Sequence, residues 1–401
     1  MSTRHPAPTE DRLRASPSFV QALTLDGRPY VAKETEPYIQ YWLSERERLL
    51  LSLFMKRGGV TASQAITQHT GTLTAQAAGR EAARSRQAIA GMLQAGVLMR
   101  SQDDTSRYDA AIVRDYVKHR PIPPEIAAHI VQCSGMQAQS RVLDLAGGPG
   151  DLALALAATS GQVSLMELSR GFLAAGRARA RARGLPLQTI HDSCNRLVFR
   201  DETYDVATVC QALHWLDDVQ LCRGLARVLN PDGSFFVVHS AIDLPDDHPL
   251  AYLLGHDSIL GRKQRQSLPE EVAPLLRRLS LLFEALDASP VQRVDFNEPG
   301  MAAGAAQRIA PAGVALFKQP RPFDAGYARG FLTPAHIAAT GMAEAHFWAD
   351  LQARCAAVSP ARMVGTHHWA VLHFQRGAKG DLGNWAQRKP RQLAYTPGDG
   401  R

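Results

Sequence analysis

Short apolar segments alternate with helical segments through the middle of the chain, and this alternation limits the fold more than any other feature of the sequence. The apolar segments are residues 141–145, 162–167, 187–190, 204–209 and 234–239. Parallel strands need long connections, which are usually helices, so strands that alternate with helices form a parallel sheet with helices on both faces. The sequence therefore predicts an α/β domain with a mostly parallel sheet.

This α/β domain is expected to span residues 125–376. A length of 401 residues favours two domains rather than one. The last two strands are expected at residues 291–296 and 367–374, and the stretches 240–290 and 298–362 are expected to be long insertions that form a lid.

The first part of the chain has helical periodicity. Residues 1–36 lack any periodicity and are expected to be a flexible leader. Residues 37–124 contain three segments with apolar residues at helical spacing, followed by a pattern typical of a short hairpin at residues 96–111. Three helices and a hairpin, in that order, are typical of a winged helix. We therefore expect a mainly helical, winged-helix-like domain ahead of the sheet.

Charge and composition limit which partners and which cellular compartment are expected. The formal net charge is +7, and residues 375–401, with six basic and two acidic side chains, contribute +4 of it. The basic tail at 377–401 is expected to be flexible. Five cysteines without a C-x-x-C pair are typical of free thiols in a reducing cytoplasm. No apolar run approaches the roughly 20 residues that span a membrane, and no residue spacing indicates a metal site. We therefore expect a cytoplasmic protein that neither spans a membrane nor binds a metal ion.

A glycine-rich loop, Asp144-Leu-Ala-Gly-Gly-Pro-Gly150, joins the first expected strand to a helix. Its glycines let the backbone approach a ligand closely, and the helix behind them begins with unpaired N–H groups. Residues 148–153 fit the G-x-G-x-x-G/A pattern of dinucleotide-binding proteins, which is too short to be specific. Asp144 ends the strand, and a carboxylate there suits a ligand that carries an ammonium group and would repel a pyrophosphate. The other interpretation of Asp144 is a cap of the following turn.

Residues 142–150 resemble the first motif of class I S-adenosylmethionine-dependent methyltransferases, with Ala146 where that family usually has its first glycine. Glu167, at the end of the second strand, matches the acid that accepts the ribose hydroxyls, and Asp192, past the third strand, matches the acid that contacts adenine. Residues 204–233 resemble the fourth-strand motif and the turn into the fifth strand. The order of these segments makes the resemblance specific, although Glu167 alone could be a surface strand end and Asp192 alone a loop acid.

The resemblance implies a Rossmann-like sheet with an antiparallel last strand and S-adenosyl-L-methionine as the cofactor. It also implies a set of cofactor-binding residues, which are Asp144, Ala146, Gly147, Gly148, Gly150, Glu167, Leu168, Asp192, Ser193 and Gln211. A winged helix ahead of such a sheet resembles the architecture of small-molecule O-methyltransferases, whose N-terminal domain mediates dimerisation. We therefore expect a homodimer that methylates a small-molecule acceptor.

His214 is the candidate catalytic residue. Methyl transfer from a sulfonium is an in-line displacement, so the protein must align the acceptor and, for a hydroxyl, remove its proton. Histidine is the natural base at neutral pH, and His214 lies just beyond the fourth strand, at the edge where open α/β sheets bind ligands. The resemblance makes His214 the general base of O-methylation, but Trp215 replaces that family's usual Asp, so a wall of the pocket is the alternative role. His367 and His368 are adjacent in an expected strand and would face opposite sides.

Other functions stay open at this stage. C- or N-methylation, or a non-methylating member of the same fold, would share the cofactor site. A DNA-binding winged-helix regulator would use Arg80, Arg84 and Arg86, but Glu81 lies among them, so nucleic acid is not expected as a partner. An NAD-dependent oxidoreductase would need an acid that pairs with the nicotinamide ribose.

Overall fold

The computed structural model describes residues 12–15, 19–23, 29–33, 40–54, 60–95, 97–100, 110–192, 194, 197, 199–254, 257–258, 261–262, 267–288, 309–330, 332, 337–338, 340–378, 380 and 382–395. The chain divides into two compact units. The first unit comprises residues 1–106 and 190–200, and the second comprises residues 107–189 and 201–401. Among the described residues, no helix is long and apolar enough to cross a membrane.

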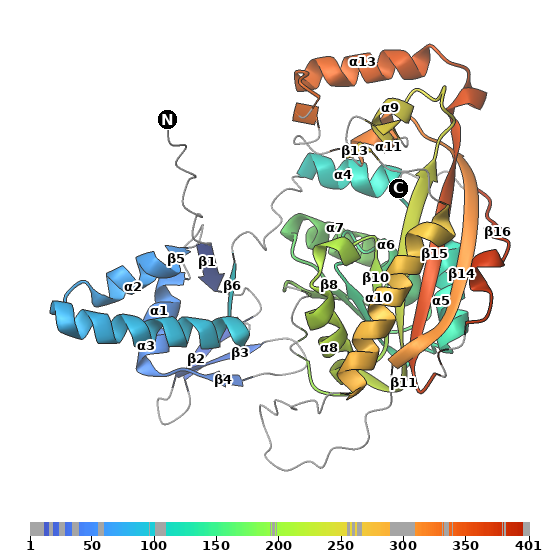
Figure 1. Ribbon diagram of the computed structural model, residues 1–401. Coiled ribbons are helices and arrows are strands. Elements are labelled where there is room, and N and C mark those ends of the chain that lie inside the picture. The colour runs from blue at the N-terminus through green and yellow to red at the C-terminus, as the bar shows by residue number, and fades with distance from the viewer. Residues whose placement is uncertain are drawn as a thin grey trace. The chain divides into compact units, whose positions relative to one another are not determined.

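The first unit combines three helices with two small antiparallel sheets (Figure 1). The elements are β1 (Arg12–Ala15), β2 (Phe19–Leu23), β3 (Pro29–Lys33), β4 (Gln40–Trp42), α1 (Glu45–Phe54), β5 (Val60–Thr61), α2 (Ala62–Thr70), α3 (Ala75–Gln94) and β6 (Leu98–Arg100). Thr61 begins α2 with a capping box, because its side chain accepts the N–H of Gln64 and the Gln64 side chain accepts the N–H of Thr61. Leu50, Phe54 and Met92 are fully buried between the helices.

The structure differs from the sequence-based expectation at both ends of this unit. Strands β1, β2 and β3 lie within residues 1–36, which were expected to be a flexible leader. In the described residues β6 pairs with β1. Residues 101–109 of the expected hairpin lie outside the described residues, and residues 110–111 begin a helix, α4 (Ala110–His119). That helix belongs to the second unit, so the boundary lies near residue 107 and not at 124.

The second unit is built on an eight-stranded sheet. After α4 its elements are α5 (Pro124–Ser134), β7 (Arg141–Leu145), α6 (Asp151–Ala157), β8 (Gln162–Met166), α7 (Arg170–Ala182), β9 (Gln188–Ile190), β10 (Tyr204–Cys210), η2 (Leu213–Trp215), α8 (Asp218–Val228), β11 (Leu229–Asp243), α9 (Ala251–Leu254), β12 (Asp257–Ser258), β13 (Gly261–Arg262), α10 (Leu268–Ala288), β14 (Ile309–Pro322), α11 (Ala325–Arg329), α13 (Glu344–Ala356), η3 (Pro360–Met363), β15 (Val364–Arg376), η4 (Trp385–Gln387) and β16 (Arg391–Gln392).

The strand order of this sheet is β16-β14-β15-β11-β10-β7-β8-β9. β7 is parallel to β8 and β10, β10 is parallel to β11, and β15 runs antiparallel between β11 and β14. The predicted α/β class, with a mostly parallel sheet and an antiparallel strand near its end, is confirmed. The chain passes from β7 to β8 and β9 on one side and returns to β10 and β11 on the other. This reversal is where open α/β sheets bind ligands, beyond the carboxyl ends of the strands.

The second half of the sheet differs from the expected boundaries. β14 occupies residues 309–322, inside the stretch 298–362 that was expected to be a lid insertion, whereas the strand expected at 291–296 lies outside the described residues. α10, inside the other expected insertion at 240–290, packs on α8 and on strands β11, β14 and β15. Part of the basic tail expected at 377–401 joins the sheet as β16, where Leu393 is buried in the core.

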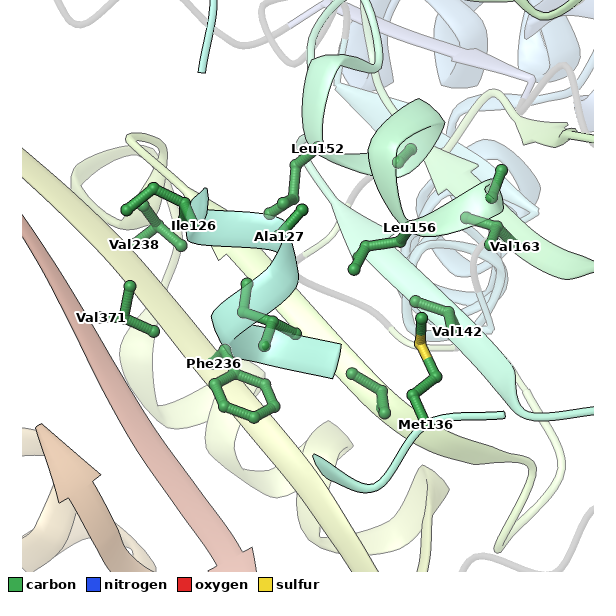
Figure 2. Packing of buried hydrophobic residues seen from close by; sticks show 14 of the residues in the cluster. Ile126, Ala127, Met136, Val142, Leu152, Leu156, Val163, Phe236, Val238 and Val371 are labelled. Carbon is green, nitrogen blue, oxygen red and sulfur yellow. The ribbon is translucent and has the colours of Figure 1, made fainter. Parts of the chain in front are cut away.

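The core of this unit forms where helices α5 and α6 pack on the sheet (Figure 2). Ile126 of α5, Leu152 of α6, Val142 of β7 and Phe236 of β11 are buried in one cluster. Each of these side chains comes from the apolar face of its element, and burial of such a side chain contributes about 1.5–3 kcal/mol. This packing fixes the carboxyl end of β7, where the glycine-rich loop begins.

Candidate functional site

The loop between β7 and α6 turns sharply through residues with positive φ. Ala146, Gly148 and Gly150 have φ of 49°, 56° and 79°. Glycine adopts this region freely, whereas an alanine there costs roughly 1–2 kcal/mol because its Cβ crowds the following carbonyl. Ala146 therefore stores backbone strain at the first position of the loop.

Gly147 is required because the Asp144 and Leu165 side chains both approach it closely. A Cβ at this position would overlap Oδ2 of Asp144 and would lie 2.5 Å from Cδ1 of Leu165. A Cβ on Gly176 of α7 would meet the same Leu165 side chain at 2.9 Å. The loop, β8 and α7 thus approach each other more closely than any residue with a side chain allows.

Asp144 lies beneath the loop and has no exposed surface. Its Oδ1 accepts a hydrogen bond from Thr208 Oγ1 of β10 at 2.6 Å, whereas its Oδ2 has no hydrogen-bond partner among the described residues. Burial raises the pKa of this carboxyl to about 7, against the opposing effect of the Thr208 hydrogen bond. A cationic ligand above the loop would lower that pKa again and keep Asp144 ionised.

Glu167, directly after β8, holds the loop from its other side. Its Oε2 accepts the N–H of Gly148 at 3.0 Å and its Oε1 accepts the N–H of Ser169 at 2.7 Å. Burial raises the pKa of Glu167, and the backbone N–H groups oppose that rise. The carboxylate is therefore fixed at the carboxyl end of β8, next to the loop.

A pocket of about 490 Å³, counting the open solvent at its mouth, lies in the second unit above the loop. Its walls come from α4 and the segment after it, from the loop and the start of α6, from the end of β10 and from β15. The lining residues are Tyr116, Arg120, Ile122, Ala146, Gly147, Gly148, Pro149, Asp151, Leu152, Cys210, Gln211, His367 and Trp369.

Three polar groups that line this pocket lack partners in the described part of the chain. They are Nε2 of Gln211, Nδ1 of His367 and Nε1 of Trp369, all of them buried atoms. Buried polar groups in folded proteins are nearly always hydrogen-bonded, so a cluster of exceptions in one pocket indicates a polar ligand. Gln211 also has a φ of 55°, which adds backbone strain of the kind found at functional sites.

His367 and His368 occupy opposite faces of β15, as their adjacency predicts. His367 is buried and lines the pocket. Its Nε2 is 3.0 Å from Oγ of Ser240 in β11, a hydrogen-bond distance. Burial holds the pKa of His367 well below 6.5, with Arg321 and Arg120 acting in the same direction. This imidazole is therefore neutral at physiological pH. His368 is half-buried and does not line the pocket.

The structure brings only part of the predicted cofactor site into the pocket wall. Ala146, Gly147, Gly148 and Gln211 line the pocket, Asp144 and Glu167 contact the loop from behind, and Gly150 begins α6. Leu168 is half-buried after Glu167. Asp192 is buried after β9, in the segment that clusters with the first unit, and Ser193 lies outside the described residues.

His214 is exposed in the short helix η2 and is not among the residues that line the pocket. Its neighbour Trp215 is 58% exposed, and the two rings lie 4.8 Å apart. His214 lies just past the carboxyl end of β10, as expected. Its side chain is exposed and does not line the pocket.

The sequence reasoning missed the wall formed by α4 and β15. The Arg120 guanidinium lies over the Tyr116 ring at 4.7 Å, and the spacing of four residues on a helix could have indicated this pair. His367 and Trp369 are two residues apart in a strand, a spacing that places both on one face. Among the described residues, no group of three His, Cys, Asp or Glu side chains could hold a metal ion.

The similarity to known proteins lies in the part of the chain that contains the glycine-rich loop. Residues 142–233 match the family described as a methyltransferase domain. The chain is 35% identical over 114 residues to the ubiquinone/menaquinone biosynthesis C-methyltransferase UbiE of Cellvibrio japonicus, covering 27% of this chain and 46% of that protein. It is 34% identical over 114 residues to UbiE of Serratia proteamaculans, covering 27% and 45%. The chain thus spans less than half the length of these relatives.

Among solved structures, a putative methyltransferase from Bacillus halodurans is 14% identical, with a TM-score of 0.40, and the likeness covers 64% of this chain and all of that one. The match of residues 142–233 confirms the predicted methyltransferase domain and locates it on the segment that contains the glycine loop, Asp144 and Glu167.

Replacing Asp144 by Asn should change how stability depends on pH. The pKa of Asp144 is about 7 in the folded protein and near 3.9 in an unfolded chain, so the folded state binds this proton more tightly. Its contribution to the free energy of unfolding is therefore complete below about pH 4 and is lost as the pH rises to about 7. Urea denaturation at several pH values should show Asp144→Asn gaining stability relative to wild type over this range. A constant difference would contradict the prediction, and Asp201→Asn, at an exposed carboxylate, is the control.

Proposed function

We propose that this protein is an S-adenosylmethionine-dependent methyltransferase that acts on a small-molecule acceptor. The observation that carries the proposal is the glycine loop over Asp144, held by Glu167 and open to a pocket with unpaired polar groups. The methyltransferase domain matched over residues 142–233 supports it. Because this match and the relatives cover only part of the chain, the activity of the whole protein is inferred.

The residues present fit this cofactor in charge and in shape. The unpaired Oδ2 of Asp144 offers a negative charge beneath the loop, which suits a ligand with an ammonium group. Gly147 leaves the backbone open at the point where a side chain would fill the cradle. Glu167 is fixed by two backbone N–H groups, and a carboxylate has lone pairs left to accept the ribose hydroxyls. We propose that Asp192 contacts the adenine.

The cofactor supplies an activated methyl group on a sulfonium, so the chain's own residues have to orient the acceptor and exclude water. We propose that Gln211, strained at the end of β10, presents its amide to the acceptor or the cofactor. The indole N–H of Trp369 would fix a second acceptor atom. Alignment of this kind is the main catalytic contribution available for an in-line displacement.

O-methylation with His214 as the general base is the first candidate reaction. His214 follows β10 at the carboxyl edge of the sheet, and its exposed imidazole is accessible to solvent that would take up the proton. C-methylation is the second candidate, and the C-methyltransferase names of the matched relatives favour it. The two reactions differ in the bond made, so nuclear magnetic resonance of the product would distinguish them.

Glu167→Ala should bind S-adenosylhomocysteine at least tenfold more weakly than wild type. Hydrogen bonds to a charged group contribute about 1.5–3 kcal/mol, and about 1.4 kcal/mol corresponds to a factor of ten. Isothermal titration calorimetry measures the change directly, with Glu202→Ala, at an exposed carboxylate outside the pocket, as the control. Wild-type affinity in Glu167→Ala, together with binding of NAD, would overturn the assignment.

His214→Ala should lower turnover about 10²-fold or more if His214 removes a proton, since that is the usual size of a general-base contribution. Affinity for S-adenosylhomocysteine should stay unchanged. The rate with His214 intact should also fall on the acidic side, where the imidazole is protonated. A variant His214→Gln that turns over near the wild-type rate, without an acid limb in the pH profile, would exclude the base and leave the methyltransferase proposal intact.

We also propose that the first unit mediates a homodimer. Large apolar side chains are exposed there, namely Trp42 at 52%, Leu49 at 40% and Leu73 at 43%. Exposed apolar surface of this kind is typical of an interaction site. Light scattering should find a dimer at micromolar concentration, and Leu49→Glu should shift it toward a monomer, with Leu281→Glu in the second unit as the control. A monomeric wild-type protein would contradict the proposal.

A further inference from the structure

A buried arginine and a buried histidine lie at the same edge of the sheet as the pocket, on β14 and β15. Arg321, near the carboxyl end of β14, and His367, near the start of β15, are each only 5% exposed. Gln319 of β14 pairs with His367. Arg321 lies two residues beyond Gln319, closer to the carboxyl end of β14. The carboxyl end of β11 reaches this edge too, since Ile242 pairs with His367 on the other side.

Arg321 is held by aromatic rings instead of an acid. Its guanidinium carbon lies 5.5 Å from the ring centre of Phe323, 5.2 Å from that of Tyr327 and 4.8 Å from that of Tyr395. Its Nη2 donates a long hydrogen bond of 3.4 Å to the carbonyl of His119, and its Nε has no partner among the described residues. None of the ion pairs found in the described part of the chain involves Arg321. A buried cation without a counter-charge is costly, so an arrangement like this one favours an anion nearby.

Arg120 brings a second guanidinium to this region and lines the pocket itself. Arg120 donates a hydrogen bond to the phenol oxygen of Tyr327, and both guanidinium groups act on the imidazole of His367 in the same direction. No described carboxylate opposes them at His367. The one acid in the described pocket wall is Asp151, whose carboxylate already pairs with Arg179. Arg120 and Arg321 thus bring two positive charges to the β15 side of the pocket.

We propose that the acceptor carries an oxyanion, either a carboxylate or a hydroxyl that ionises near neutral pH, and that this oxyanion binds to Arg120 beside His367, with the charge of Arg321 behind them. This inference rests on the proposed methyltransferase function. The neutral imidazole of His367 and the indole N–H of Trp369 then hydrogen-bond the uncharged part of the same molecule.

The cofactor has a carboxylate as well, but the position of the basic groups favours the acceptor. The cofactor residues proposed above follow β7, β8 and β9, on one side of the strand-order reversal. His367 and Arg321 are on β15 and β14, on the other side of β10 and β11. At about 4.8 Å per strand, β15 lies roughly 14 Å from β7 across the sheet. An acceptor placed over β10 and β11 would lie between the loop and these basic groups.

Two small probes of nearly the same shape test this inference, the anion 4-fluorobenzoate and the neutral 4-fluorobenzamide. Each is titrated into the full-length protein saturated with S-adenosylhomocysteine and followed by fluorine-19 nuclear magnetic resonance. In wild type, 4-fluorobenzoate should bind at least tenfold more tightly than 4-fluorobenzamide. In Arg120→Gln the two affinities should become equal within about twofold, while calorimetry shows unchanged affinity for S-adenosylhomocysteine. Unchanged cofactor affinity also shows that the variant is folded.

Arg329→Gln is the matched control, because Arg329 lies over the Trp348 ring at 4.3 Å in the same unit and does not line the pocket. It should keep the wild-type preference for the anion.

Equal binding of the two probes to wild type, or a preference that survives Arg120→Gln, would overturn the inference while leaving the proposed function standing. A tenfold loss of S-adenosylhomocysteine affinity in Arg120→Gln would overturn it too, by assigning Arg120 to the cofactor. Failure of wild type to bind S-adenosylhomocysteine would instead overturn the proposed function and this inference with it.

Discussion

The close contact between the Asp144 carboxyl and Gly147 governs the geometry of the whole pocket. Asp144 is anchored to β10 by the hydroxyl of Thr208, so the loop above it is fixed relative to two neighbouring strands at once. Leu165 of β8 and Gly176 of α7 close the same contact from the side. Because a Cβ at Gly147 would have to displace the Asp144 carboxyl and the Leu165 side chain, the loop backbone faces the pocket in one conformation, and Glu167 locks it by accepting the N–H of Gly148.

This rigidity is combined with local strain and unmet hydrogen bonds. Ala146 and Gln211 have positive φ, and they directly follow the ends of β7 and β10. These are the adjacent strands at which the strand order reverses, so the strain is concentrated where a ligand would bind. The unpaired nitrogens of Gln211, His367 and Trp369 add a desolvation cost that a polar ligand would offset. The folded scaffold is thus less stable without a ligand than its packing would allow.

Local sequence signals predicted the loop half of the site but not its other wall. The strands around Asp144 and Glu167 and the loop between β7 and α6 follow from short contiguous patterns, and their predicted bounds agree with the structure within a few residues. β14 was missed because Pro311, Pro320 and Pro322 interrupt its pattern. Proline is tolerated there because, in the described part of the chain, the outer edge of β14 pairs with β16 only at residues 317–318. His367 could be matched with Arg321 only through a long-range strand register that no local pattern encodes.

The two histidines at this edge of the sheet have different environments and can contribute differently to methyl transfer. His214 is exposed beside Trp215, whereas His367 is buried and kept neutral by burial and by two guanidinium groups. A neutral hydroxyl acceptor has to lose its proton, which requires a base that can pass the proton to solvent, as an exposed imidazole can. An acceptor whose reacting oxygen is already ionised has no such proton to lose, and the positive charges of Arg120 and Arg321 favour that ionised form. The protonation state of the reacting oxygen, and not the net charge of the acceptor, therefore decides whether a base is needed at the position of His214.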